Sequence, residues 1–338
     1  MTKSTLAFLL CLGCFAAVAQ TNTEAYKLGV EGVLKVDNGE YKEGISLLKK
    51  ARNLEPQDYD FAFEIGKAYL KSGNPKMAEK YLFPLQYHTQ VQADLYLLLA
   101  QCYYELDDNK KTPNPDRKKE LDALRYGLQK LPSEGVLYLE LGRRNIEMEK
   151  PVEALVVLES GILNAPNFAE NYYWAAKLLI AADNHLWAWL YAEVCYNQTD
   201  DVDLKRSAAM IVTGSSNIVF AGKWKADPEK LDQDIQFAFA NKCFKSLDIE
   251  FDNQLLKRQC LLENFEGSPL SITPILARQK LIISKGWHAA YIWSILQESD
   301  KESFLKWIPE NAVEFDEFRN WSYWNPLVLK APIRRLNP

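Results

Sequence analysis

Apolar and small residues recur through the first two hundred or so positions with a period of about 34 residues. Within residues 59–92, the apolar positions Ile65, Tyr69 and Leu82 lie at helical spacing on either side of Gly73. This pattern predicts two short amphipathic helices joined by a glycine turn. Because neither helix can bury its apolar face alone, we expect such hairpins to stack on one another.

The period predicts five successive helical hairpins. They cover residues 25–58, 59–92, a third segment from Ala93 onward, 135–168 and 169–202. Small residues at Gly32 and Gly44 let the two helices of the first hairpin approach closely. In the second hairpin, Asn74 is placed to cap a helix that starts at Pro75, and Pro84 is expected to shorten or kink that helix.

The third hairpin carries an insertion of about eight residues beyond the period, between Asp107 and Glu120. Insertions in repeat proteins map to loops on one face, and such loops can be functional. A tolerated surface loop explains the same residues, and we favour this interpretation.

Small residues, turn glycines and closing prolines such as Pro56 and Pro166 recur in phase across residues 20–202. In these features the segment resembles the tetratricopeptide repeat family. The resemblance implies an all-α fold, a right-handed solenoid of paired helices. It also implies a concave groove, lined by the first helix of each pair, that commonly holds an extended peptide or a partner's helix.

After Val202 the repeat phase is lost, and residues 203–338 are predicted to be a divergent helical region with an extended tail. The run Gly214–Ser216 predicts a break. Helices are expected at residues 229–247, 253–264, 272–285, 287–296, 301–307 and 312–321. The aromatic segment from Gly286 to Trp321 is similar to the C-terminal segments of secreted bacterial tetratricopeptide proteins that have no assigned activity.

Residues 1–19 have the pattern of a secretion signal. Lys3 precedes an apolar run over residues 6–16, and Ala17 to Ala19 supply the small residues of a cleavage site. We therefore expect cleavage after Ala19 and a periplasmic or secreted protein. A lipoprotein signal with Cys14 as the lipidated residue is the alternative, and it would anchor the chain to a membrane.

Composition argues against several classes of partner. The chain has 40 basic and 45 acidic side chains, for a formal net charge of -5, and no dense basic tract, which disfavours nucleic acid. No apolar run after the signal is long enough to span a membrane. Beyond the signal, the cysteines are Cys102, Cys195, Cys243 and Cys260. Their spacing fits neither a disulfide framework nor a zinc site, so buried thiols are favoured, with one bridge possible.

No motif in the sequence carries a catalytic mechanism. His88, His185 and His288 lack metal-ligand spacing, and the chain has no Gly-rich phosphate loop and no nucleophile motif. We therefore expect no metal, no cofactor and no enzymatic activity. A catalytic cluster that forms only in three dimensions is left open.

The groove implied by the resemblance is the candidate binding site. Its expected lining is Phe63, Lys67, Lys71, Gln101, Tyr104, Leu139, Arg143, Tyr173 and Lys177, with Tyr26 and Val33 at its N-terminal end. Lys67, Arg143 and Lys177 take the same place in three repeats, with Gln101 between them. Such donors can hold the carbonyls or carboxylates of a peptide, while the rings cover apolar side chains. A solvated, salt-bridged helix face explains this row of donors equally well.

The sequence thus predicts a non-catalytic scaffold of the cell envelope that binds a peptide or protein segment in this groove. The alternative is a glycan-binding accessory protein that uses its C-terminal tryptophans, which are Trp287, Trp293, Trp307, Trp321 and Trp324. Because the end of a solenoid must be closed, we favour these rings as a hydrophobic cap.

Overall fold

The computed structural model describes residues 24–107, 115–220, 274–297 and 300–329, and every regular element in these ranges is a helix. The chain forms two compact units, Met1–Leu131 and Pro132–Pro338. The predicted signal at residues 1–19 and the predicted helices at 229–247 and 253–264 lie outside the described residues. The all-α fold class is confirmed.

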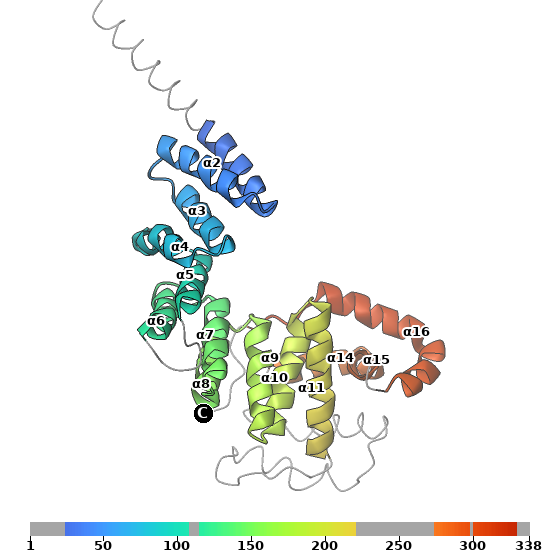
Figure 1. Ribbon diagram of the computed structural model, residues 1–338. Coiled ribbons are helices and arrows are strands. Elements are labelled where there is room, and N and C mark those ends of the chain that lie inside the picture. Colours follow the sequence, from blue (N-terminus) through green and yellow to red (C-terminus); the bar gives the residue numbers. More distant parts are fainter. Residues whose placement is uncertain (1–23, 108–114, 221–273, 298–299, 330–338) are drawn as a thin grey trace, which may run out of the picture. The chain divides into compact units, whose positions relative to one another are not determined.

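The first unit consists of antiparallel helical hairpins (Figure 1). Its elements are a helix over residues 24–37, α2 (Tyr41–Leu54), α3 (Tyr59–Lys71), α4 (Pro75–Leu82), the short 3-10 helix η1 (Phe83–Tyr87), α5 (Ala93–Leu106) and α6 (Pro115–Lys130). The turns after the first helix and after α3 contain Gly39 and Gly73, both at positive φ (83° and 75°). A residue with a Cβ is strained in this conformation, which explains the glycine at each turn.

The first hairpin is held by direct backbone packing. A Cβ atom at Gly32 would lie 3.0 Å from the carbonyl oxygen of Gly44, and one at Gly44 would lie 2.7 Å from that of Gly32. Both positions therefore require glycine, as the sequence predicted.

The second hairpin departs from the others at its end. Asn74 caps α4 by accepting a hydrogen bond from the backbone N–H of Met77 at 3.2 Å, and Pro75 takes the first helical position. The helix stops at Leu82, and η1 follows with Pro84 in its first turn. The expected cap and the shortening of this helix are both confirmed.

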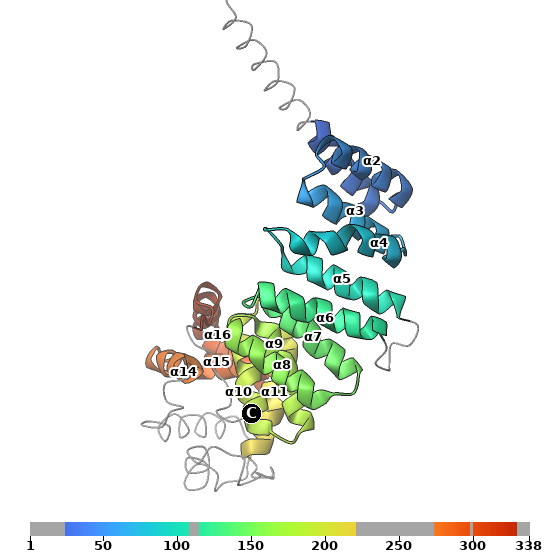
Figure 2. The same ribbon diagram turned by 90° about the vertical axis from the view of Figure 1, so that its left-hand side faces the viewer.

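The second unit holds further hairpins and the C-terminal helices. Its elements are α7 (Gly135–Glu147), α8 (Pro151–Asn164), α9 (Ala169–Ala181), α10 (His185–Gln198), α11 (Val202–Phe220), α14 (Pro274–Ser284), α15 (His288–Leu296) and α16 (Lys301–Trp324). One hydrophobic core includes Tyr172 of α9, Tyr191 of α10, Trp293 of α15 and Phe315 of α16. In both views α15 lies beside α11 (Figures 1 and 2). The C-terminal helices therefore share a core with the last hairpins.

Two helix boundaries in this unit differ from the prediction. The expected break at Gly214–Ser216 is wrong, because α11 runs through it, with Ser216 Oγ donating a hydrogen bond to the carbonyl of Thr213 at 3.2 Å. The two short helices expected at residues 301–307 and 312–321 are one helix, α16, with Pro309 inside it. An interior proline costs about 3 kcal/mol. Burial of apolar side chains on both sides of Pro309 offsets this cost.

A buried polar cluster joins α10 to α14 and α15. The Glu193 side chain on α10 is fully buried, and its carboxylate accepts hydrogen bonds from Trp189 Nε1 at 2.6 Å, Gln279 Nε2 at 2.5 Å and the Tyr291 hydroxyl at 2.5 Å. Asn197 Nδ2 donates to the same hydroxyl at 3.0 Å. Because each of these polar groups has a partner, the cluster fixes the position of the C-terminal helices.

Arg278 on α14 extends this cluster to the end of α16. Its Nε donates to Asn197 Oδ1 at 2.9 Å, one terminal nitrogen donates to the Asn325 carbonyl at 2.6 Å, and the guanidinium lies 4.8 Å from the Trp321 ring centre. Burial lowers the pKa of Arg278 below its usual value. Beyond α16, Asn167 makes two hydrogen bonds to the backbone of Leu329. The end of the described chain is thus attached to the turn before α9.

Candidate functional site

In the first unit, the predicted donors are paired with acceptors. Lys67 Nζ lies 3.2 Å from Glu64, and Lys71 Nζ lies 2.8 Å from Asp37. The hydrogen bond from Lys71 lowers the pKa of the Asp37 carboxyl and raises the pKa of Lys71. Gln101 Nε2 likewise donates to Glu105 at 3.0 Å. These three predicted donors therefore belong to a solvated, ion-paired surface.

The other predicted residues of this unit vary in exposure. Phe63 is half-buried and stacks on Tyr59 with ring centres 5.7 Å apart. Tyr104 is half-buried with the Arg117 guanidinium 5.3 Å from its ring centre. Tyr26 is 69% exposed, and Val33 packs at the edge of the core. These residues do not gather into a single cluster.

The second unit brings its predicted residues together around a tryptophan. The Lys177 ammonium lies 4.3 Å from the Trp174 ring centre and 5.6 Å from that of Tyr173. On the neighbouring helix, the Arg143 guanidinium lies 5.7 Å from the same Trp174 ring. Leu139, one turn before Arg143, packs at the edge of the core. We call these five residues, from α7 and α9, the α7/α9 face.

The cations of the α7/α9 face are held by rings rather than by carboxylates. Within the described ranges, Lys177 makes no ion pair, and Arg143 has only a long contact of 3.8 Å to Glu140. Glu140 itself lies 2.5 Å from Arg144. A cation over a ring is held in position while its N–H donors can still bind an acceptor. The face therefore offers charged donors next to apolar ring surface.

The sequence-based set of groove residues omitted Trp174. The sequence spacing did indicate this position, because Trp174 stands three residues before Lys177 and therefore shares its helical face. The ring is half-buried and contacts both cations. Trp174 is thus the centre of the face, not only a core residue.

The C-terminal tryptophans are largely packed. Trp293 is 2% exposed and lies 6.0 Å from Trp307, ring centre to ring centre, and Trp287 lies 5.6 Å from Trp321. Trp324 differs, with 73% of its surface exposed. These contacts support the hydrophobic cap and leave few ring faces open to a sugar.

Cysteines and possible metal ligands show no reactive arrangement in the described residues. Cys102 and Cys195 are buried free thiols, while Cys243 and Cys260 lie outside those residues. Burial raises the pKa of the Cys102 thiol to about 12, and the pKa of Cys195 also rises because of burial. In the described part of the chain, no three His, Cys, Asp or Glu side chains are grouped so that they could hold a metal ion.

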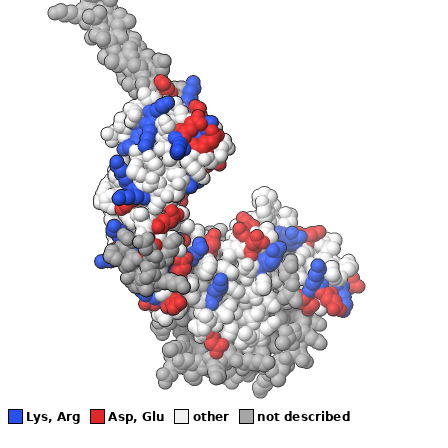
Figure 3. All heavy atoms as spheres, in the orientation of Figure 1, with Lys and Arg blue, Asp and Glu red and all other residues white. Residues whose placement is uncertain are grey.

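Charge is mixed on the molecular surface. On the face drawn in Figure 3, basic and acidic side chains alternate over both units, and no broad field of one sign is visible outside the grey atoms. None of the described helices combines the length and apolar content needed to cross a bilayer. The mixed surface agrees with the composition, which disfavours nucleic acid.

A family model described as the tetratricopeptide repeat matches residues 35–102. These residues extend from the end of the first helix into α5. This part of the chain is a tetratricopeptide repeat array. The hairpins α7–α8 and α9–α10 of the second unit have the same order of helix, tight turn and helix. Tetratricopeptide repeats form a scaffold for protein–protein interaction, because stacked repeats create extended binding surfaces.

Several solved structures are similar to the chain. A thermophilic tetratricopeptide protein of Thermus thermophilus has 19% identity and a TM-score of 0.40, covering 56% of this chain and 98% of that chain. The pilF protein of Pseudomonas aeruginosa has 14% identity and a TM-score of 0.45, covering 59% and 86%. MamA has 19% identity and a TM-score of 0.40, covering 53% and 92%. At these values the likenesses say nothing about what this chain binds. The comparison with curated proteins found no match.

Proposed function

We propose that this tetratricopeptide repeat protein is a non-catalytic scaffold that binds a segment of a partner protein on the α7/α9 face. The observation that supports the proposal is the placement of Lys177 and Arg143 over the ring of Trp174. A peptide carboxylate or carbonyl accepts hydrogen bonds from the two cations, and a neighbouring apolar side chain of the peptide covers the exposed parts of Tyr173 and Trp174.

The contrast with the first unit favours this location. There the side chains of Lys67, Lys71 and Gln101 already bind Glu64, Asp37 and Glu105. A partner would have to displace these carboxylates before it could bind the donors. The cations of the α7/α9 face keep their contacts with the rings when a carboxylate arrives, so binding there has a smaller cost.

The proposed place of action is the cell envelope, outside the cytoplasm. The N-terminal pattern of Lys3, an apolar run and Ala17 to Ala19 supports this location, and cleavage after Ala19 is preferred over lipidation of Cys14. Mass spectrometry of the chain purified from its native source tests this part. A first residue at Gln20 supports secretion, whereas a chain that still starts at Met1 contradicts it.

Affinity capture from the native extract tests the binding proposal. The bait is the full chain, compared with Arg143→Ala/Lys177→Ala and with the matched control Lys67→Ala/Lys71→Ala, which removes equal charge from donors that are already paired. All three proteins must first show the same melting temperature. We expect a partner that the wild type and the control capture and the α7/α9 variant loses. Equal capture by all three, or loss only in the control, contradicts the proposal.

A further inference from the structure

The second repeat, which belongs to the first unit, has an unusual surface. Because α4 ends at Leu82, the chain continues as η1 and leaves Phe83 43% exposed and Tyr87 71% exposed. Their rings meet edge to face, with centres 6.1 Å apart. Large aromatic side chains exposed together at a break in a regular repeat are a mark of an interaction surface.

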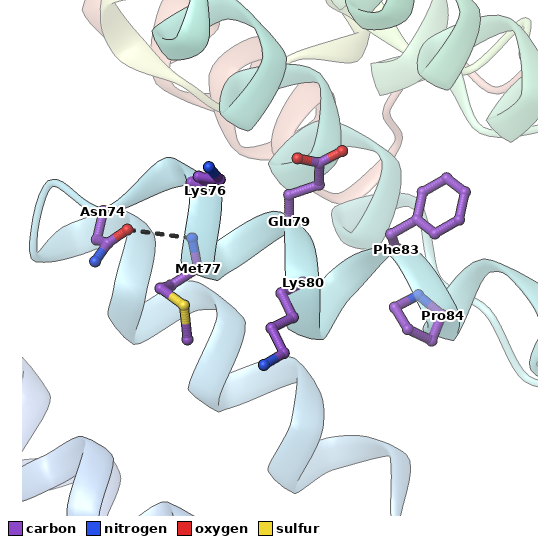
Figure 4. Close-up of a pocket in the computed structure, with 7 residues that line it drawn as sticks. All are labelled: Asn74, Lys76, Met77, Glu79, Lys80, Phe83 and Pro84. Carbon is purple, nitrogen blue, oxygen red and sulfur yellow. Dashed lines mark hydrogen bonds between the residues drawn. The ribbon is translucent and has the colours of Figure 1, made fainter.

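A depression of about 380 Å³ runs along α4 to Phe83 (Figure 4). Met77 lies in it, with Phe83 and Pro84 at the end of the helix. Methionine is unbranched and flexible, so it adapts to different apolar side chains. The volume lies near the lower end of the range of about 300–1,000 Å³ for small binding pockets. It suits one or two side chains of a peptide.

Two cations border the depression. Lys76 and Lys80 stand one turn apart on α4, and both are exposed. Among the described residues, neither makes an ion pair or a hydrogen bond through its ammonium group, in contrast to Lys35, Lys67 and Lys71 in the same unit. In Figure 4, the side chains of Lys76 and Lys80 point to opposite sides of α4, and Lys80 lies on the side of Met77.

The lining also contains one acidic residue, Glu79, which makes no ion pair with either lysine among the described residues. In Figure 4, Glu79 points away from Met77 and Lys80 and lies on the same side of α4 as Lys76. Its carboxylate interacts with the hydroxyl of Tyr103 on α5, whose pKa is raised chiefly by burial and further by Glu79. The depression therefore combines an apolar surface with two lysines and one carboxylate, and that carboxylate interacts with Tyr103.

We propose that this depression on α4 binds a short amphipathic segment of a partner protein, in which a bulky apolar residue is flanked by acidic residues. The apolar side chain contacts Met77, Phe83 and Pro84, and the flanking carboxylates pair with Lys76 and Lys80. This site is independent of the α7/α9 face. The chain would then hold partner segments at two places, one in each unit.

Methionine methyl NMR tests the proposal directly, because the chain has only four methionines. The full chain is labelled with 13C at its methionine methyl groups, and Met77→Leu assigns the signal of interest. The probe is the capped synthetic peptide Glu-Glu-Leu-Phe-Glu-Glu. One control peptide replaces every Glu by Lys, and another replaces Leu-Phe by Ser-Ser. We expect a saturable shift of the Met77 signal with the first peptide alone.

Charge reversal completes the test. Lys76→Glu/Lys80→Glu should weaken binding of the acidic peptide about tenfold or more, since two ion pairs become repulsive. The matched control Lys42→Glu/Lys50→Glu makes the same change in charge on exposed lysines of α2 and should leave the affinity unchanged. The titration is repeated in the Arg143→Ala/Lys177→Ala background, which separates this site from the α7/α9 face. An unmoved Met77 signal, an equal response to the Lys or Ser peptide, or equal affinities of the two charge variants would overturn the proposal.

Discussion

Replacing Tyr291 by Phe tests how the C-terminal helices are attached to the repeats. Tyr291 is 1% exposed, and its hydroxyl donates to Glu193 and accepts from Asn197. The substitution keeps the ring and its edge contact with Phe318, with centres 5.8 Å apart. It removes only the hydroxyl oxygen, so a stability change reports the polar cluster rather than a cavity.

The expected loss is about 2 kcal/mol in the free energy of unfolding, since a hydrogen bond to a carboxylate contributes about 1.5–3 kcal/mol. Urea denaturation followed by tryptophan fluorescence measures this loss. If the free energy of unfolding falls by about 3 kcal/mol per M urea, the urea concentration at the midpoint of unfolding should decrease by roughly 0.7 M. Tyr323→Phe is the matched control, because Tyr323 is 65% exposed and its change should stay within about 0.5 kcal/mol. A Tyr291→Phe variant as stable as that control would refute the role of the cluster.

Three further predictions concern buried side chains. Trp293→Ala should lower the free energy of unfolding by about 3–5 kcal/mol, as measured by thermal or urea unfolding. Trp324→Ala should change it by less than about 0.5 kcal/mol, and equal losses in the two variants would contradict the packing described for the cap. Iodoacetamide at pH 8 should leave Cys102 and Cys195 unmodified in the folded chain and should label both when the chain is unfolded in guanidinium. Peptide mass spectrometry measures the labelling, and labelling of the folded chain would show that these thiols are accessible. Burial raises the pKa of Tyr196 from 10.0 to about 12, so its contribution to stability is present below pH 10 and is lost as the pH rises towards 12. Tyr196→Phe should flatten the stability profile in that window, and an unchanged slope would argue against this assignment.

The repeat fold could be predicted because its signals are local. A glycine at positive φ ends a helix through its own backbone conformation, independently of distant residues. The repeat spacing of Gly39 and Gly73 therefore locates two of the turns. The errors arose where tertiary contacts outweigh local preference. Gly214 lies inside α11, and Pro309 lies inside α16, because both helices have apolar side chains in a shared core. No local signal reports that core.

The binding site was predicted less completely. Lys67 and Lys177 take the same place in their repeats, but one contacts a carboxylate and the other contacts a ring. The partner of such a cation depends on neighbouring helices: Lys71 pairs with Asp37, which is 34 positions away in the sequence. Spacing identified which residues share a face. It did not show which donors remain available, and it did not place Trp174 in the predicted groove.

Photo-crosslinking is the most direct test of the proposal that a partner lies on the α7/α9 face. The photoreactive residue p-benzoylphenylalanine is placed at Tyr173, beside Trp174 and Lys177, and in a second protein at Val156, an exposed position on α8. Both proteins are irradiated in native extract, and the products are identified by mass spectrometry. We expect a partner that crosslinks to position 173 and not to position 156, and that is lost when Arg143→Ala/Lys177→Ala is added. Crosslinks from position 156 alone, or products at position 173 that survive the loss of both cations, would contradict the proposal.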